Sequence, residues 1–369
     1  MQLAQSGFTM SENPPKSVNQ KNLPPAITGP SAWYGKQMGN SQEWLHQLSP
    51  DDISEVAAAV APLAAGDADV ATIRASDFPL PRLGPKLLAI REEVINGRGF
   101  ALMRGMPVER WSVRESAIAY YGIGCHFGNA RSQNGSGHVL GHVRDVGRDA
   151  ENDPTARIYQ TTERQTFHTD SCDVVGLLCL KTAQSGGESA LVSSMTIYNE
   201  MLKRRPDLLP SLFEPLMTDR RGEIPEGQKP WHEIPVFNWH QNYLSVIYAR
   251  RYIESARRFP EVPALTKTQT EALDLFDQLA NDPEIGMQML FQPGDMQWVH
   301  NHTMLHDRMS YNDWVEPEKK RHLLRLWLAV PGARPLPPIY AQRYGTVNVG
   351  DRGGIVVPGA RLNAPLEVV

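Results

Sequence analysis

Short strand-like stretches from residue 157 onward restrict the fold of this chain more than any other feature. They are apolar or alternate between apolar and polar residues, and helical patterns at 195–212 and 266–280 interrupt them. This order is not the regular strand–helix alternation of a doubly wound parallel sheet. It predicts an α+β fold, with a β-sandwich or jelly-roll core and with flanking and inserted helices. The strand-like stretches are 157–161, 165–170, 174–181, 189–193, 234–248, 286–300 and 322–330.

The first third of the chain has a different pattern. Ser49 is a good N-cap for a helix that starts at Pro50, and two further helices are predicted at 84–97 and 110–122. A short apolar stretch at 99–105 predicts a buried strand between them. We expect this third to form an α/β layer beside the core rather than the core itself.

The domain organisation follows from length and local composition. A chain of 369 residues is long for one core, yet no linker or repeat divides it. Residues 1–30 hold few large apolar residues and several prolines, which predicts a flexible extension with Met10 as an alternative start. We expect one domain over 31–345, with its catalytic part at about 95–335, and a tail over 346–369.

The stretch 129–157 is rich in Gly, Asn, Asp and Arg and carries no strong strand or helix pattern. A connection this long inside a compact domain is commonly a lid or a binding loop. We expect it to form a lid over a site.

Composition excludes several classes of protein. The net charge is 37 − 41 = −4 and the pI is about 6.3, so the chain lacks the basic character of a nucleic-acid binder. No apolar run is long enough to cross a membrane, and no signal-peptide core is present. Three cysteines are too few for a disulfide framework, so we expect a cytoplasmic, reducing compartment.

The strand at 165–170 carries a histidine and a carboxylate two residues apart. Side chains alternate along a strand, so His168 and Asp170 would point to the same side and grip one metal ion. With eleven histidines in the chain, a surface His–Asp pair is the alternative. A second histidine would complete the face that holds non-haem Fe(II). His300, His302 and His306 are the candidates, and periodicity does not choose between them.

Two arginines follow the histidine-rich strand. Arg321 and Arg325 are four residues apart and would share one face of a strand. Arg325 lies within the apolar stretch 323–328, where a guanidinium needs a partner. Arg321 follows two lysines, so the alternative is that Arg321 belongs to a solvent-exposed run of positive charges. An iron site with an arginine clamp for a carboxylate suggests a 2-oxoglutarate pocket.

In these motifs the chain resembles the TauD/TfdA family of Fe(II)/2-oxoglutarate-dependent dioxygenases, which includes taurine, 2,4-dichlorophenoxyacetate and γ-butyrobetaine dioxygenases. The resemblance covers roughly 95–335, with four motifs in the same order. It implies a double-stranded β-helix core, and it selects His306 as the third iron ligand beside His168 and Asp170. The motifs are His168-Thr169-Asp170, Ser185-Gly186-Gly187-Glu188-Ser189, Pro293-Gly294-Asp295 followed by Asn301 to His306 and Arg308, and Arg321-x-x-x-Arg325.

The same resemblance implies Fe(II), 2-oxoglutarate and O2 as the reaction partners. Arg321 matches the arginine that pairs with the distal carboxylate of 2-oxoglutarate. Arg325 matches the one near its other carboxylate or the substrate, and the two roles could be exchanged. Ser189 takes the place of a threonine whose hydroxyl bonds the cosubstrate. The implied reaction yields succinate and CO2 and oxidises, most simply hydroxylates, a small molecule.

The substrate side is less constrained. Asn134 and Arg164 are the candidates for contacting the substrate, with a surface salt bridge as the alternative for Arg164. We expect a small-molecule substrate, no nucleic-acid or membrane partner, and possible homo-oligomers. Two other functions use the same residues: a non-catalytic sensor of iron or 2-oxoglutarate, and a zinc-dependent hydrolase. The hydrolase would give Arg321 and Arg325 no role.

Overall fold

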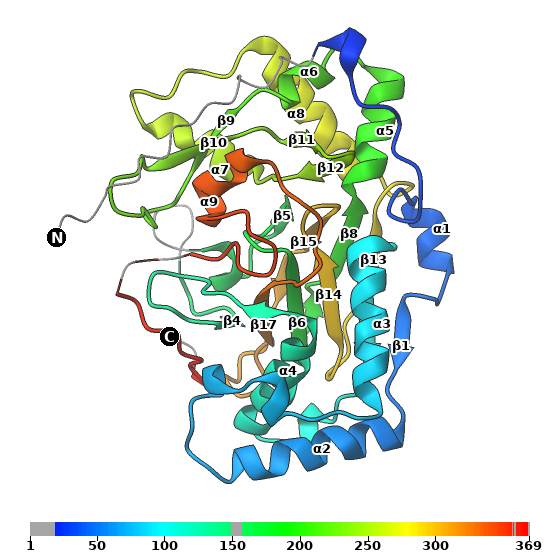
Figure 1. Ribbon diagram of the computed structural model, residues 1–369, viewed down its shortest axis with the longest axis vertical. Helices are drawn as coiled ribbons and strands as arrows, with labels where there is room; N and C mark the ends of the chain where they lie inside the picture. The colour runs from blue at the N-terminus through cyan, green and yellow to red at the C-terminus, as the bar shows by residue number, and fades with distance from the viewer. Residues whose placement is uncertain (1–18, 149–156, 356, 358, 368–369) are drawn as a thin grey trace, which may run out of the picture.

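The structure is a computed structural model that describes residues 19–148, 157–355, 357 and 359–367. Its centre is a seven-stranded sheet in the order β1-β2-β14-β6-β17-β3, with β4 also paired to β17 (Figure 1). Only the β1–β2 pair of this sheet is parallel; the other pairs are antiparallel. The strands are β1 (Leu45–Gln47), β2 (Phe100–Arg104), β3 (Asn129–Ala130), β4 (Leu140–Val143), β6 (Val174–Lys181), β14 (Met296–His300) and β17 (His322–Ala329).

A second, fully antiparallel sheet has four strands in the order β13-β8-β15-β5. Three two-stranded ribbons, β7–β16, β9–β10 and β11–β12, complete the strands of the described residues. The second sheet consists of β5 (Gln165–His168), β8 (Ser189–Ser193), β13 (Met287–Met289) and β15 (Met304–Arg308). The ribbons consist of β7 (Ser185–Gly186), β9 (Leu216–Asp219), β10 (Trp231–Ile234), β11 (Phe237–His240), β12 (Tyr243–Val246) and β16 (Tyr311–Asn312).

The alternation of side chains along β17 shows how the layers are built. Leu324 and Leu326 pack into the core on the helical side of the large sheet, whereas Leu323 and Trp327 belong to a second core shared with the four-stranded sheet. That second core also contains Leu191 of β8. The two sheets therefore enclose an apolar layer, into which inward-facing polar side chains can also project.

The helices α3 (Leu83–Asn96) and α4 (Val113–Phe127) pack against the outer face of the large sheet, and α2 (Pro50–Ala64) packs against α4 (Figure 1). The predicted start of α2 is confirmed: Ser49 and Asp52 form a capping box. The third helix was expected at 110–122 but begins after a second capping box at Ser112 and runs further. The first third is also not a separate layer, because β1 and β2 belong to the large sheet.

Other helices pack against the outer face of the four-stranded sheet, among them α5 (Ser194–Arg204), α6 (Leu209–Leu212) and α8 (Lys267–Ala280). The helix expected at 266–280 is confirmed, with Thr266 as its cap. The prediction of a single helix at 195–212 is wrong, since the structure has two helices, α5 and α6, in this stretch. Pro206 lies between them and disfavours helical geometry in the residue before it. The remaining α-helices of the described chain are α1 (Gly35–Asn40), α7 (Arg250–Ser255) and α9 (Ala341–Tyr344).

Two expectations about the middle of the chain are corrected. The stretch 157–161 is not a strand but contains the 3-10 helix Ile158–Gln160. The stretch 129–157 was expected to lack packed elements, yet β3 and β4 lie within it and both pair with β17. Residues 149–156 of the expected lid lie outside the described residues.

Segments near both ends contact the main body of the chain. The Ile27 N–H donates to Asn199 Oδ1 at 2.7 Å, which attaches part of the expected N-terminal extension to α5. In the expected tail, the fully buried Arg352 donates from Nε to Asp173 Oδ1 at 2.7 Å. The proposed domain boundaries stay a prediction, and residues 1–18, including Met10, lie outside the described part. No helix among the described residues is both long and apolar enough to span a membrane.

Candidate active site

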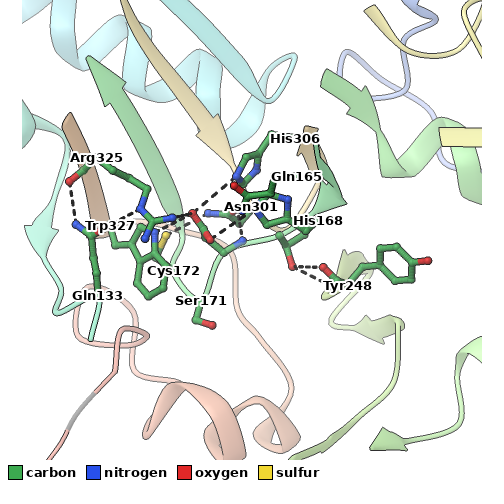
Figure 2. Close-up of polar contacts among 12 residues, drawn as sticks. Gln133, Gln165, His168, Ser171, Cys172, Tyr248, Asn301, His306, Arg325 and Trp327 are labelled. Atoms are coloured by element: carbon green, nitrogen blue, oxygen red, sulfur yellow. Dashed lines mark hydrogen bonds and ion pairs between the residues drawn. The ribbon is translucent and has the colours of Figure 1, made fainter. Parts of the chain in front are cut away.

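Two histidines on neighbouring strands and one carboxylate converge between the sheets (Figure 2). His168 at the end of β5 pairs directly with His306 of β15, and their ring centroids are 4.2 Å apart. Asp170 Oδ1 lies 3.9 Å from His168 Nε2, and Asp170 Oδ2 lies 3.7 Å from His306 Nε2. One candidate ligand atom from each of the three residues lies within 4.8 Å of the other two, which is close enough to hold one metal ion.

Asp170 is placed beside the histidines by a turn, not by the alternation of side chains along a strand. The strand β5 ends at His168, so Asp170 follows the strand instead of belonging to it. The Asp170 N–H donates to Asn301 Oδ1 at 2.9 Å, and the Thr169 N–H donates to the Tyr248 carbonyl at 2.8 Å. These two bonds fix the turn that returns the carboxylate toward the histidines.

The structure brings His306 to the pair, not His300 or His302. The strand β14 ends at His300, whose Nδ1 bonds Thr303 Oγ1 at 2.9 Å. His302 lies in the following turn and bonds Asp173 Oδ1 through Nε2 at 2.9 Å. One nitrogen of each ring is thus bonded within the buried turn, and only His306, one strand further along the chain, lies with His168 and Asp170.

The protonation states fit a divalent cation. Burial, and after it the neighbouring His168, lower the pKa of His306 to about 3, so its imidazole is neutral near pH 7. The His168 Nδ1–H donates to the Thr166 carbonyl at 2.9 Å, which leaves the lone pair on Nε2. Burial raises the pKa of Asp170, but Arg325, the two histidines and a Trp327 hydrogen bond together outweigh burial and lower it. A neutral His306 imidazole and an anionic Asp170 carboxylate therefore lie beside His168 Nε2.

Two residues in the surroundings of Asp170, Trp327 and Gln133, were missed by the sequence analysis. Trp327 donates from its indole N–H to Asp170 Oδ2 at 2.8 Å (Figure 2). Arg325 lies 3.6 Å from the same oxygen, and its Nε donates to Gln133 Oε1 at 2.7 Å. A signal for Trp327 was present, because it lies two residues after Arg325 on one strand and therefore on the same face. No sequence pattern indicates Gln133.

A narrow pocket beside the histidines is lined by Ser189, Arg321 and Arg325. Arg321 is buried, and its Nη1 has no hydrogen-bond partner among the described residues. Its guanidinium lies 5.2 Å from the ring centroid of Tyr311. Ser189 donates from Oγ to Gln297 Oε1 at 3.4 Å, a long bond. An unpaired buried guanidinium beside a hydroxyl is a suitable environment for a carboxylate.

A larger cavity of about 330 Å³ also borders this group and is lined by His168, Asp170 and Arg325. Arg164 lines it too, but its guanidinium pairs with Asp307 Oδ2 at 2.7 Å and bonds Asn281. Asn134 does not line this cavity. Its Oδ1 accepts from the Ser136 and His138 N–H groups, which organises its own loop.

Two histidines and one carboxylate in a buried site are the ligand set of the non-haem Fe(II) oxygenases. The chain belongs to the family described as "Taurine catabolism dioxygenase TauD, TfdA family", whose model matches residues 59–327. It is 34% identical over 316 residues to FR-33289 synthase of Streptomyces rubellomurinus (strain ATCC 31215), a match that covers 84% of this chain and 92% of that protein. It is 31% identical over 304 residues to the taurine hydroxylase-like protein SAT17 of Stachybotrys chartarum (strain CBS 109288 / IBT 7711), covering 80% and 77% of the two chains.

Solved structures share the fold. Asparagine oxygenase, in complex with Fe(II), a 3-hydroxyasparagine and succinate, matches with a TM-score of 0.60 at 16% identity, over 78% of this chain and 93% of that one. The non-haem iron oxygenase OrfP, in complex with Fe and α-ketoglutaric acid, matches with a TM-score of 0.58 at 16% identity, over 77% and 93%. Family membership and the His-Asp-His set make this chain an Fe(II)/2-oxoglutarate-dependent dioxygenase, with iron and 2-oxoglutarate as its cofactors.

Proposed function

We propose that this enzyme couples the decarboxylation of 2-oxoglutarate to the hydroxylation of a small molecule. The observation that carries the proposal is the position of His168, Asp170 and His306 between two spaces of different character. One is the narrow pocket with an unpaired arginine, and the other is the cavity of about 330 Å³. The first suits the cosubstrate, and the second has room for a small-molecule substrate.

Bound iron and 2-oxoglutarate supply the activation of O2: one oxygen atom enters succinate, CO2 leaves, and the second oxygen is inserted into a substrate C–H bond. His168 and His306 would offer nitrogen lone pairs and Asp170 a negative charge to the ion. Trp327 would hold the carboxylate in place by its hydrogen bond at 2.8 Å.

The second part of the proposal assigns the cosubstrate contacts. Arg321 would pair with the distal carboxylate of 2-oxoglutarate, since its Nη1 is buried and unpartnered. Ser189 would add its hydroxyl, because it lines the same pocket. Arg325 lines both the pocket and the cavity, so it would lie where cosubstrate and substrate meet.

The proposal extends to the architecture. The four-stranded sheet and the facing part of the large sheet would form the two halves of a double-stranded β-helix. Support comes from the apolar core that the two sheets share and from the likeness to asparagine oxygenase and OrfP. In this arrangement the metal ligands project from β15 and from the end of β5 into the space between the halves.

The test is substrate-dependent formation of succinate. Purified protein is supplied with Fe(II), 2-oxoglutarate and O2, and candidate acids and amines are screened for succinate formation above the background without substrate. We expect at least one compound to yield succinate and a product heavier by one oxygen atom in equal amounts. A protein that binds iron but neither binds nor consumes 2-oxoglutarate would contradict the proposal.

A further inference from the structure

One wall of the large cavity is built by segments far apart in the sequence. Arg220 follows β9, His232 lies in β10 and Arg343 lies in α9; we call these three residues the basic wall. The helix α9 is held against the β9–β10 ribbon through Gln342, whose Oε1 accepts the Glu233 N–H at 2.9 Å. Arg220 Nη2 donates to the Gln342 carbonyl at 2.5 Å, which places the two arginines next to each other.

The arginines of the basic wall have no counterion. Arg220 is 4% exposed, and its hydrogen bonds go to the Lys229 and Gln342 carbonyls and to Gln228 Oε1, all neutral acceptors. Arg343 donates from Nε to Ser171 Oγ at 2.7 Å. Among the described residues, no carboxylate oxygen lies within 4 Å of either guanidinium. Two neighbouring cations in this state are costly unless an anion joins them.

The nearby carboxylates are already engaged by other arginines. Glu223 Oε2 pairs with Arg157 Nη2 at 2.8 Å. Asp219 Oδ2 pairs with Arg258 Nε at 3.1 Å. The positive charge of Arg220 and Arg343 is therefore left over on this side of the cavity.

His232 adds a neutral hydrogen-bonding group to the same wall. Burial, and then the charges of Arg343 and Arg220, lower its pKa well below the ordinary value for histidine. The ring is 5% exposed and makes no hydrogen bond with other described residues; its Nδ1 is a buried atom without a partner. An uncharged imidazole next to two guanidiniums can donate one more hydrogen bond to an oxyanion.

The basic wall is connected to the metal ligands. Ser171, which receives the Arg343 hydrogen bond, follows Asp170 directly in the chain. His168 and Asp170 line the same cavity as the three residues of the wall. A ligand anchored at Arg343 can therefore extend within one continuous space to the metal.

We propose that Arg220, His232 and Arg343 bind a phosphate or phosphonate group of the substrate, while the carbon to be oxidised lies beside the metal. A phospho dianion balances two guanidiniums, and its tetrahedral oxygens accept from both planar forks. A carboxylate or sulfonate carries one charge and leaves one arginine uncompensated. This inference rests on the proposed hydroxylation of a small molecule and names the chemical class of its substrate.

The test measures binding, not turnover. The full chain is loaded anaerobically with Fe(II) and 2-oxoglutarate and titrated calorimetrically with propylphosphonate, propyl phosphate, propanesulfonate and butanoate. We expect the two phospho compounds to bind at least about tenfold more tightly than the other two, or about 1.4 kcal/mol. The difference between propylphosphonate and propyl phosphate then distinguishes a phosphonate from a phosphate ester.

Variants separate the basic wall from general charge effects. Arg220→Gln and Arg343→Gln should each weaken propylphosphonate binding at least about tenfold and leave 2-oxoglutarate affinity unchanged. A cooperative thermal unfolding transition without ligand, together with unchanged 2-oxoglutarate affinity, shows that the variants fold. Arg82→Gln, which removes an exposed arginine paired with Asp51, is the matched control and should bind like the parent protein.

Equal binding of all four anions, or unchanged propylphosphonate binding in both wall variants, would overturn the inference. So would the absence of any phosphonate binding in a protein that still binds 2-oxoglutarate and Fe(II). The absence of phosphonate binding would not contradict the proposed hydroxylation of a small molecule. Loss of 2-oxoglutarate consumption with intact phosphonate binding would instead contradict the proposed function.

Discussion

The candidate metal centre and the basic wall border the same cavity but differ in how their charges are balanced. At the metal centre, Asp170 has Trp327, Asn301 and Arg325 as neighbours within the protein. At the basic wall, Arg220 and Arg343 have only neutral hydrogen-bond partners. The first region is organised before any ligand arrives, and the second has charge that only a ligand can balance.

The two regions also differ in their supporting structure. The histidines come from β5 and β15, which pair with each other inside a four-stranded sheet. The basic wall comes from a two-stranded ribbon and from α9, a helix of four residues. Under the two proposals, chemistry that requires fixed ligand geometry would lie on the sheet, and recognition of the substrate would lie on short elements at its margin.

Removing a metal ligand should separate the two regions most strongly. We expect His168→Ala and His306→Ala to lower iron content and 2-oxoglutarate turnover by at least about a hundredfold, more than the loss of an outer hydrogen bond to a ligand. Phosphonate binding at the basic wall should persist in the same variants. Iron analysis and calorimetry measure the two quantities, with His240→Ala as the control. Loss of iron in His302→Ala but not in His306→Ala would show that the third ligand is misassigned.

Removing the hydrogen bond that orients Asp170 tests whether the metal centre is organised by its surroundings. Trp327→Phe keeps the aromatic packing but deletes the donor at 2.8 Å from Asp170 Oδ2. We expect iron affinity to fall about 10- to 100-fold, with the melting temperature nearly unchanged. Iron titration of the parent and the variant measures the difference. Unchanged affinity would mean that Asn301 and Arg325 suffice to hold the carboxylate.

The cosubstrate clamp should respond less strongly but selectively. Arg321→Lys replaces a planar fork by a point charge, so we expect 2-oxoglutarate to bind at least about tenfold more weakly, or about 1.4 kcal/mol. Arg325→Lys should instead uncouple succinate formation from substrate oxidation. Binding measured anaerobically with Fe(II) distinguishes the two. If Arg325→Lys loses the cosubstrate and Arg321→Lys retains it, the two roles must be exchanged.

The smallest effect on ligand binding is expected at Arg164, an arginine of the same cavity that does have a counterion. Arg164→Gln leaves the buried Asp307 without its partner, so we expect a loss of about 1–3 kcal/mol in unfolding free energy. Affinity for propylphosphonate should not change, in contrast to Arg343→Gln. Thermal or chemical unfolding and calorimetry provide both numbers. A large loss of phosphonate affinity would place Arg164 in the substrate site.

Local patterns in the sequence predicted the strands that have a clear apolar pattern and the helices that begin at a clear N-cap residue. The bounds of β6 and β8 and the start of α8 at its Thr266 cap were predicted correctly from such signals. The interval 129–148 was not, because β3 and β4 are short edge strands specified by pairing with β17 and not by their own composition. Tertiary pairing decides such segments, and it leaves little trace in a single sequence.

The candidate site shows the same division. His168 and Asp170 could be found because they stand two residues apart, although a turn held by Asn301, not a continuous strand, brings them together. Choosing His306 required the resemblance to a known family. Arg220 and Arg343 could not be connected from the sequence, because the contact between them depends on how α9 packs against a distant ribbon.

The buried bond between Asp173 and Arg352 links the metal site to the timing of synthesis. The two residues are separated by 179 positions, and Asp173 lies three residues after the ligand Asp170. The chain is synthesised from its N-terminus, so Arg352, the arginine that pairs with Asp173, is made after both His168 and His306. Removal of the C-terminal segment that carries Arg352 would therefore leave a buried carboxylate, three residues from Asp170, without its arginine.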